Sequence, residues 1–213
     1  EKAVVSRKGA YTGVSVLNIS SDDIDLFYKQ GFVKCNDIGQ DKLFYPNECI
    51  VLKSNDRKSA LAIHNDGMFK KLYTASGNNF SVQGIMPRSK EQRFACELLL
   101  NPSVHMVTLT GKAGSGKTLM SVACAVHMLA EKRYDKIIIS RPVQSMSKDI
   151  GYLPGTKEEK MEPWIQPIFD NFKHIFKNSD HYLDLLLDKK KIEVEALTYI
   201  RGRSIPNAIF ILD

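Results

Sequence analysis

Three glycines, a lysine and a threonine within eight residues have the types and spacing needed to hold phosphate. They belong to the stretch Gly111-Lys112-Ala113-Gly114-Ser115-Gly116-Lys117-Thr118, which fits the pattern G-x-x-x-x-G-K-[ST]. The glycines let the backbone curl until its N–H groups face inward, and a following helix adds partial positive charge. Lys117 would then reach the β- and γ-phosphates of ATP, and the Thr118 hydroxyl would bind Mg²⁺.

The segments on either side of this loop decide whether the pattern is more than a chance match. Residues 105–110 form a short run of β-branched and apolar character, which predicts the buried strand that precedes such a loop. Beyond the loop, apolar residues recur at helical spacing and predict a helix over about 117–131. Strand, loop and helix come in the required order, so a chance glycine-rich turn is disfavoured.

An acidic residue closes the last apolar strand of the sequence. Residues 208–213 (AIFILD) end in Asp213, which is the pattern of a Walker B strand. The carboxylate of such a strand lies beside the loop and holds the water shell of Mg²⁺.

The two ends of the sequence are unusual for a complete protein. The chain starts at Glu1 rather than Met, and a sheet that ended at residues 208–213 would leave backbone groups and apolar surface at its edge exposed to solvent. We therefore expect a protein truncated at both ends.

The pattern of elements changes near residue 85. Residues 1–85 predict a small β-rich module, with a short helix from about Ser20 to Gly31 and strands within 42–53 and 58–74. Residues 86–213 predict strands at 105–110, 136–141, 192–197 and 208–213, and helices at 90–100, 117–131 and 164–187. This alternation predicts an α/β fold with a parallel sheet, a RecA-like P-loop NTPase core incomplete at its C-terminus.

Composition narrows the class of protein only modestly. The chain carries 30 Lys and Arg against 24 Asp and Glu, an excess that favours polyanionic partners without proving them. Four scattered cysteines predict buried, reduced thiols (Cys35, Cys49, Cys96 and Cys124). With no secretory leader and no apolar run of membrane-spanning length, we expect a cytoplasmic protein with no membrane partner.

Several stretches carry a resemblance to a known family. They are PRSKEQRFACELLL, VTLTGKAGSGKTL, KIIISRPVQSMSKDIGYLPGTKEEKMEPWIQPIFDNF, YIRGRSIPNAIFILD and, upstream, YTGV and YPNE. From about Tyr11 to Asp213 the chain resembles the PhoH-like ATPases, in particular those with a PIN-type nuclease domain ahead of the ATPase. The run DIGYLPGTKEEKMEPWIQPIFDN is far more specific than the phosphate loop. The resemblance implies a helicase-like motor that acts on single-stranded RNA and assembles as a homo-oligomeric ring.

Two roles are open for Gln92. The resemblance implies that this glutamine reads adenine, with its amide accepting from N6 and donating to N7. Ser89-x-x-Gln92 is also the spacing of a capping box, in which the glutamine side chain would bond to the backbone of Ser89.

Three arginines are candidate RNA contacts. Arg141 follows the strand residues 136–140, at the carboxyl edge where open α/β sheets bind ligands. The resemblance implies that a loop at this strand end touches the nucleic-acid backbone. Arg201 and Arg203 flank Gly202 just ahead of the last strand, and guanidinium groups suit bidentate phosphate contacts. Ordinary solvated arginines are the alternative for each.

The combined prediction is ATP-dependent work on RNA, with Lys117, Thr118 and Asp213 as the catalytic residues. In the family that the chain resembles, a glutamate directly after the Walker B aspartate orients water. That position follows Asp213, and no arginine finger can be assigned. We therefore expect the 213-residue chain to bind ATP but to hydrolyse it poorly. Two alternatives stay open: a phosphotransferase, and a nucleotide-switched RNA-binding module without motor activity.

Overall fold

The structure is a computed structural model of the chain. It describes residues 12–38, 43–75, 79–141, 157–177, 180–200 and 202–213. The chain divides into two compact units, Glu1–Phe80 and Ser81–Asp213.

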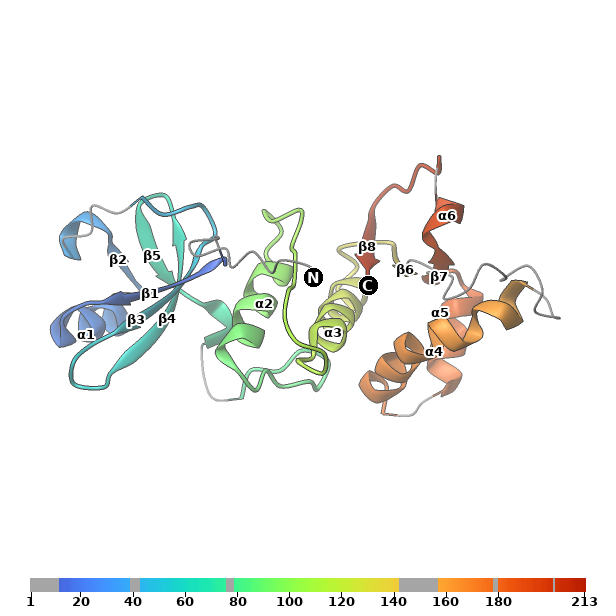
Figure 1. Ribbon diagram of the computed structural model, residues 1–213, viewed down its shortest axis with the longest axis horizontal. Coiled ribbons are helices and arrows are strands. Elements are labelled where there is room, and N and C mark those ends of the chain that lie inside the picture. The colour runs from blue at the N-terminus through green and yellow to red at the C-terminus, as the bar shows by residue number, and fades with distance from the viewer. Residues whose placement is uncertain (1–11, 39–42, 76–78, 142–156, 178–179, 201) are drawn as a thin grey trace, which may run out of the picture. The chain divides into compact units, whose positions relative to one another are not determined.

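The N-terminal unit is built on a five-stranded sheet in the order β1-β3-β4-β5-β2 (Figure 1). Its strands are β1 (Val14–Asn18), β2 (Phe32–Lys34), β3 (Cys49–Lys53), β4 (Ser59–Asn65) and β5 (Met68–Lys71). β1 pairs with β3 in parallel, and the other pairs are antiparallel. The unit also contains helix α1 (Ser21–Gln30) and the 3₁₀ turns η1 (Asn36–Ile38) and η2 (Tyr73–Ala75).

Local sequence signals explain the boundaries of these elements. The Ser20 side chain caps α1 by accepting from the Asp23 N–H, and Gly31 ends the helix with a left-handed φ of 81°. Asp66 and Gly67 both have positive φ between β4 and β5, as a tight hairpin turn requires. The predicted helix and hairpin are confirmed. Two strands, β1 and β2, were not predicted individually; β2 is only three residues long.

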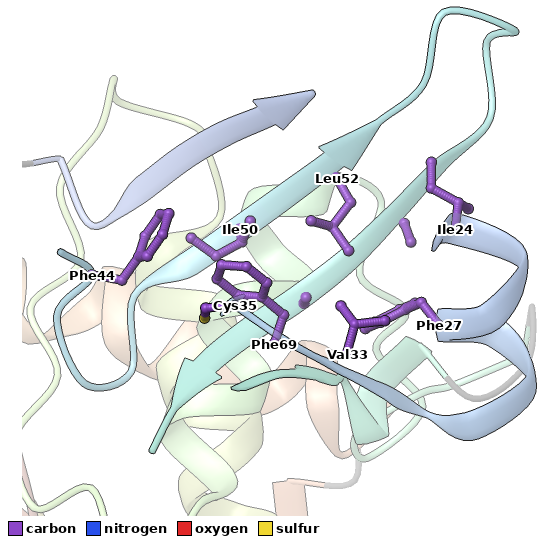
Figure 2. Packing of buried hydrophobic residues seen from close by; sticks show 10 residues of the cluster. Ile24, Phe27, Val33, Cys35, Phe44, Ile50, Leu52 and Phe69 are labelled. Carbon is purple, nitrogen blue, oxygen red and sulfur yellow. The ribbon is translucent and has the colours of Figure 1, made fainter. Parts of the chain in front are cut away.

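One buried cluster fills the space between α1 and the sheet (Figure 2). Ile24 and Phe27 of α1 are fully buried. Ile50 and Leu52 lie two residues apart on β3, so they point to the same face of the sheet, and both are fully buried. Phe69 of β5 is also fully buried in this cluster. Burial of apolar surface is the main favourable contribution to folding, so this cluster holds the N-terminal unit together.

The C-terminal unit contains a parallel sheet in the order β7-β6-β8. The strands are β6 (Lys136–Arg141), β7 (Ile192–Ala196) and β8 (Ala208–Leu212). The helices are α2 (Lys90–Leu100), α3 (Lys117–Ala130), α4 (Lys157–Ile175), α5 (Asp180–Asp188) and the short α6 (Leu197–Ile200). α3 contacts α2, α4, β6 and β8, and α5 contacts β7 (Figure 1). A mixed α/β fold with a parallel sheet is therefore confirmed for this unit.

Two predicted elements of this unit were wrong. Residues 105–110 form no strand, and Met106 is 85% exposed. A strand needs a neighbouring strand to pair its backbone groups. In the described part of the chain, residues 105–110 pair with none of the three strands of this sheet, and β8 pairs only with β6. The single helix predicted at 164–187 is two helices, α4 and α5, since Lys177 adopts a positive φ after α4 ends.

The four cysteines are free and buried, as predicted. A hydrogen bond with the Cys96 side chain, together with burial, raises the pKa of Cys124 far above its usual value. None of the helices in the described residues combines the length and apolar character needed to cross a membrane.

Candidate nucleotide-binding site

The glycine-rich loop lies between the extended segment that follows α2 and the first turn of α3. Gly114 and Gly116 have φ values of 75° and 82°, which favour glycine over residues with a side chain. Gly116 is also the N-cap of α3 and has no side chain to satisfy the first N–H groups of the helix. Those N–H groups and the positive end of the helix dipole are suited to bind an anion.

Lys117 folds back over this loop. Its Nζ donates to the backbone oxygens of Gly111 at 3.0 Å and Lys112 at 2.9 Å, and lies 3.5 Å from Ser115 Oγ. These contacts hold the ammonium group at the loop, where the phosphates of a nucleotide would lie. The contact of Lys117 with the β- and γ-phosphates stays a prediction.

Thr118 and Asp213 are brought together although 95 residues separate them. Thr118 Oγ1 donates to Asp213 Oδ1 at 2.6 Å, and the Asp213 N–H donates to the backbone oxygen of Ser140 at 3.0 Å. The first turn of α3 supplies the hydroxyl, and the carboxyl end of β8 supplies the carboxylate. Hydroxyl and carboxylate oxygens are the ligands that Mg²⁺ prefers, so this pair fits that ion.

Arg141 lies beside the same carboxylate. Its Nε is 3.7 Å from Asp213 Oδ2, and Arg141 is the last residue of β6, the strand next to β8. The two Asp213 oxygens therefore face different partners, Thr118 on one side and Arg141 on the other. The ion pair places Arg141 at the edge of the candidate nucleotide site.

Gln92 contacts the phosphate loop directly. Its Nε2 donates to the backbone oxygen of Ser115 at 3.1 Å, and its Oε1 accepts from the Arg88 N–H at 2.7 Å. Ser89 caps α2 by accepting from the Gln92 N–H, as predicted. The other half of the predicted capping box is wrong, because the glutamine side chain reaches Arg88 instead of Ser89. The bond to Ser115 was not predicted, since it joins residues 23 positions apart.

Arg203 has carboxylate partners on β7. Its Nη1 is 2.6 Å from Glu195 Oε2, and its Nη2 is 3.0 Å from Glu193 Oε2. Lys136 adds a second cation at Glu193, and hydrogen bonds from Lys136 and Arg203 hold the pKa of Glu193 below its usual value. These contacts join Arg203 to β7. Arg201 lies outside the described residues.

Comparison with known proteins identifies relatives of the whole chain and of its second unit. A family model described as PhoH-like protein matches residues 84–213. Protein PhoH2 of Bacillus subtilis (strain 168) is 40% identical over 217 residues, covering 99% of this chain and 48% of the relative. Protein PhoH2 of Mycolicibacterium smegmatis is 33% identical over 205 residues, covering 95% and 45%. Protein PhoH of Escherichia coli (strain K12) is 38% identical over 111 residues, covering 52% and 31%.

The chain thus spans about half the length of the PhoH2 relatives. The family match includes the phosphate loop, Gln92, Arg141 and Asp213. The chemistry of this site and the match over most of the second unit agree: the chain belongs to the PhoH-like family of P-loop ATPase-like proteins.

Proposed function

We propose that this chain contains the ATP- and Mg²⁺-binding part of a motor that hydrolyses ATP and acts on RNA. The observation that carries the proposal is the 2.6 Å contact between Thr118 Oγ1 and Asp213 Oδ1. It joins the end of the phosphate loop to the end of β8, which is the arrangement that Mg²⁺–nucleotide chemistry needs in a RecA-like core.

Each residue of the site has a defined part in this proposal. The backbone N–H groups of residues 111–118 hold the phosphates, and Lys117 neutralises their charge. Thr118 and Asp213 would hold Mg²⁺. When bound, Mg²⁺ neutralises charge that develops on the phosphate oxygens during transfer. Gln92, whose amide contacts the loop at Ser115, reads the adenine of the same nucleotide.

The RNA part of the proposal depends on charge and on Arg141. The chain has a formal charge of +6, which favours a polyanion. Arg141 lies at the carboxyl edge of the parallel sheet beside Asp213, so an RNA phosphate bound there would be next to the nucleotide. We extend the proposal to a cytoplasmic, ring-forming protein with a PIN nuclease domain ahead of this chain, and to RNA contacts by Arg201 and Arg203.

The test is phosphate release from ATP by the full-length protein, measured with and without single-stranded RNA. We expect RNA to stimulate release strongly and the stimulation to vanish in a Lys117→Ala variant. Transfer of phosphate to a small molecule would support a phosphotransferase instead. ATP-dependent RNA binding without turnover would support the nucleotide-switched module.

Gln92→Ala tests the base-reading role. If the amide accepts from the exocyclic amine of adenine, the substitution should weaken ATP binding about three- to tenfold and inosine triphosphate binding less. Dissociation constants for both nucleotides, measured by calorimetry, give the comparison. Equal losses for the two nucleotides would contradict adenine recognition.

A further inference from the structure

We infer that Gln92 is a positioning residue for the phosphate loop, and that it acts on the phosphates whatever base the nucleotide carries. Its Nε2 holds the backbone oxygen of Ser115, and this contact fixes the direction of the next N–H, that of Gly116. The inference rests on the proposed nucleotide binding. It is separate from adenine recognition, because its effect should appear with a ligand that has no base.

The geometry of the peptide bond supplies the first step. In a planar trans peptide, the C=O of one residue and the N–H of the next point in opposite directions. When Gln92 Nε2 holds the Ser115 oxygen toward α2, the Gly116 N–H must point away from α2. A peptide that binds phosphate through its N–H needs that N–H turned toward the phosphate, so its oxygen points away from it. The glutamine amide thereby selects this orientation for one peptide of the loop.

The position of α2 makes this contact firm. Gln92 lies in the first turn of α2, and its Oε1 accepts from the Arg88 N–H at 2.7 Å. At the other end of α2, Arg133 Nη2 donates to the backbone oxygen of Leu100 at 3.0 Å. The C-terminal end of the helix is therefore held by Arg133, and the amide of Gln92 is held from two directions, by Arg88 and by Ser115. A donor fixed in this way can restrain the loop, whereas a mobile surface side chain could not.

The packing of Gly116 points to the same close approach. A Cβ atom at this position would lie 2.9 Å from Gln92 Nε2, closer than side-chain carbons come to other atoms. A side chain at position 116 would therefore make the Gln92 amide shift away from its present place beside the loop. The positive φ of Gly116 favours glycine, and the absence of a side chain lets the Gln92 amide approach the loop this closely.

This role leaves the amide able to read a base. A glutamine oxygen has two lone pairs and its nitrogen carries two hydrogens. The contacts with Arg88 and Ser115 use one of each. The remaining lone pair and hydrogen suit N6 and N7 of adenine, so one side chain can touch both the base and the loop.

The experiment uses inorganic tripolyphosphate, which has the phosphates of ATP but no base, with Mg²⁺ and the full-length protein. Gln92→Met keeps the length of the side chain and removes both hydrogen bonds. We expect it to weaken tripolyphosphate binding about three- to tenfold. Ser89→Ala is the matched control, since it removes the cap of α2 and keeps the amide. It should leave tripolyphosphate binding within about twofold of the unmodified protein.

Melting temperatures of both variants separate positioning from general destabilisation. A greater loss of tripolyphosphate affinity in Gln92→Met than in Ser89→Ala, at a similar or smaller loss of stability, supports the inference. Unchanged tripolyphosphate binding in Gln92→Met overturns it and leaves the proposed function standing. If the unmodified protein binds neither tripolyphosphate nor ATP, both the inference and the proposed function are wrong.

Discussion

Replacing Lys117 with alanine in the full-length protein should weaken ATP binding about ten- to a hundredfold and reduce phosphate release by at least about a hundredfold. The ammonium group is held at the loop by the backbone oxygens of Gly111 and Lys112. Bound phosphates would replace these neutral partners with charged ones, so the lysine gains most when charge builds up on the transferred group. Calorimetric titration with ATP and a phosphate-release assay measure the two effects.

Lys112→Ala provides the matched control, because it removes an equal charge from an exposed residue of the same loop. Its effect on ATP affinity should stay within about threefold, as expected for a screened surface charge. Comparable losses for the two variants would mean that the loop attracts ATP by its total charge. The proposed contact of the Lys117 ammonium group with the phosphates would then have no support.

The phosphate loop was predictable because its information is local. Eight consecutive residues and the helix after them define it, and α3 begins at Lys117 as the pattern predicts. The ends of α2 were also predictable, since Ser89 is a strong N-cap and Asn101-Pro102 follows the last turn. The strand that carries Asp213 forms as predicted, and its carboxylate meets Thr118.

The contacts of Gln92 and Arg203 were not predictable in the same way, because each joins separate elements. The Ser115 oxygen that Gln92 holds becomes available only after the loop folds against α2. For Arg203 a signal was present in the sequence. Glu193 and Glu195 alternate with apolar residues on β7, so both carboxylates point to one face of the strand. A nearby arginine can pair with them there.

The strand predicted at 105–110 could not be judged from its sequence pattern alone. Its composition favours a strand, but a strand is defined by its neighbour. The composition of a segment shows only that its side chains suit a strand. A neighbouring strand must then pair with its backbone before the strand can form. In the described residues, no strand pairs with positions 105–110.

Thr118→Val should remove most of the dependence of ATP binding on Mg²⁺. Valine keeps the branched shape of threonine and replaces the hydroxyl with a methyl group, so the metal loses one oxygen ligand and Asp213 Oδ1 loses its donor. We expect the ratio between ATP dissociation constants in EDTA and in Mg²⁺ to fall about tenfold or more, and turnover to fall about a hundredfold. Folding should change little, because the contact is exposed to solvent.

Thr118→Ser decides whether the hydroxyl itself is responsible. Serine restores the oxygen and lacks only the methyl group, so it should recover most of the Mg²⁺ dependence that valine removes. Asp213→Asn should resemble Thr118→Val, because the amide keeps the shape of the carboxylate but loses its charge. If valine at position 118 leaves the Mg²⁺ dependence unchanged, the Thr118–Asp213 contact only joins α3 to β8. The metal must then be held by other residues, and the observation on which the proposed function depends would no longer support it.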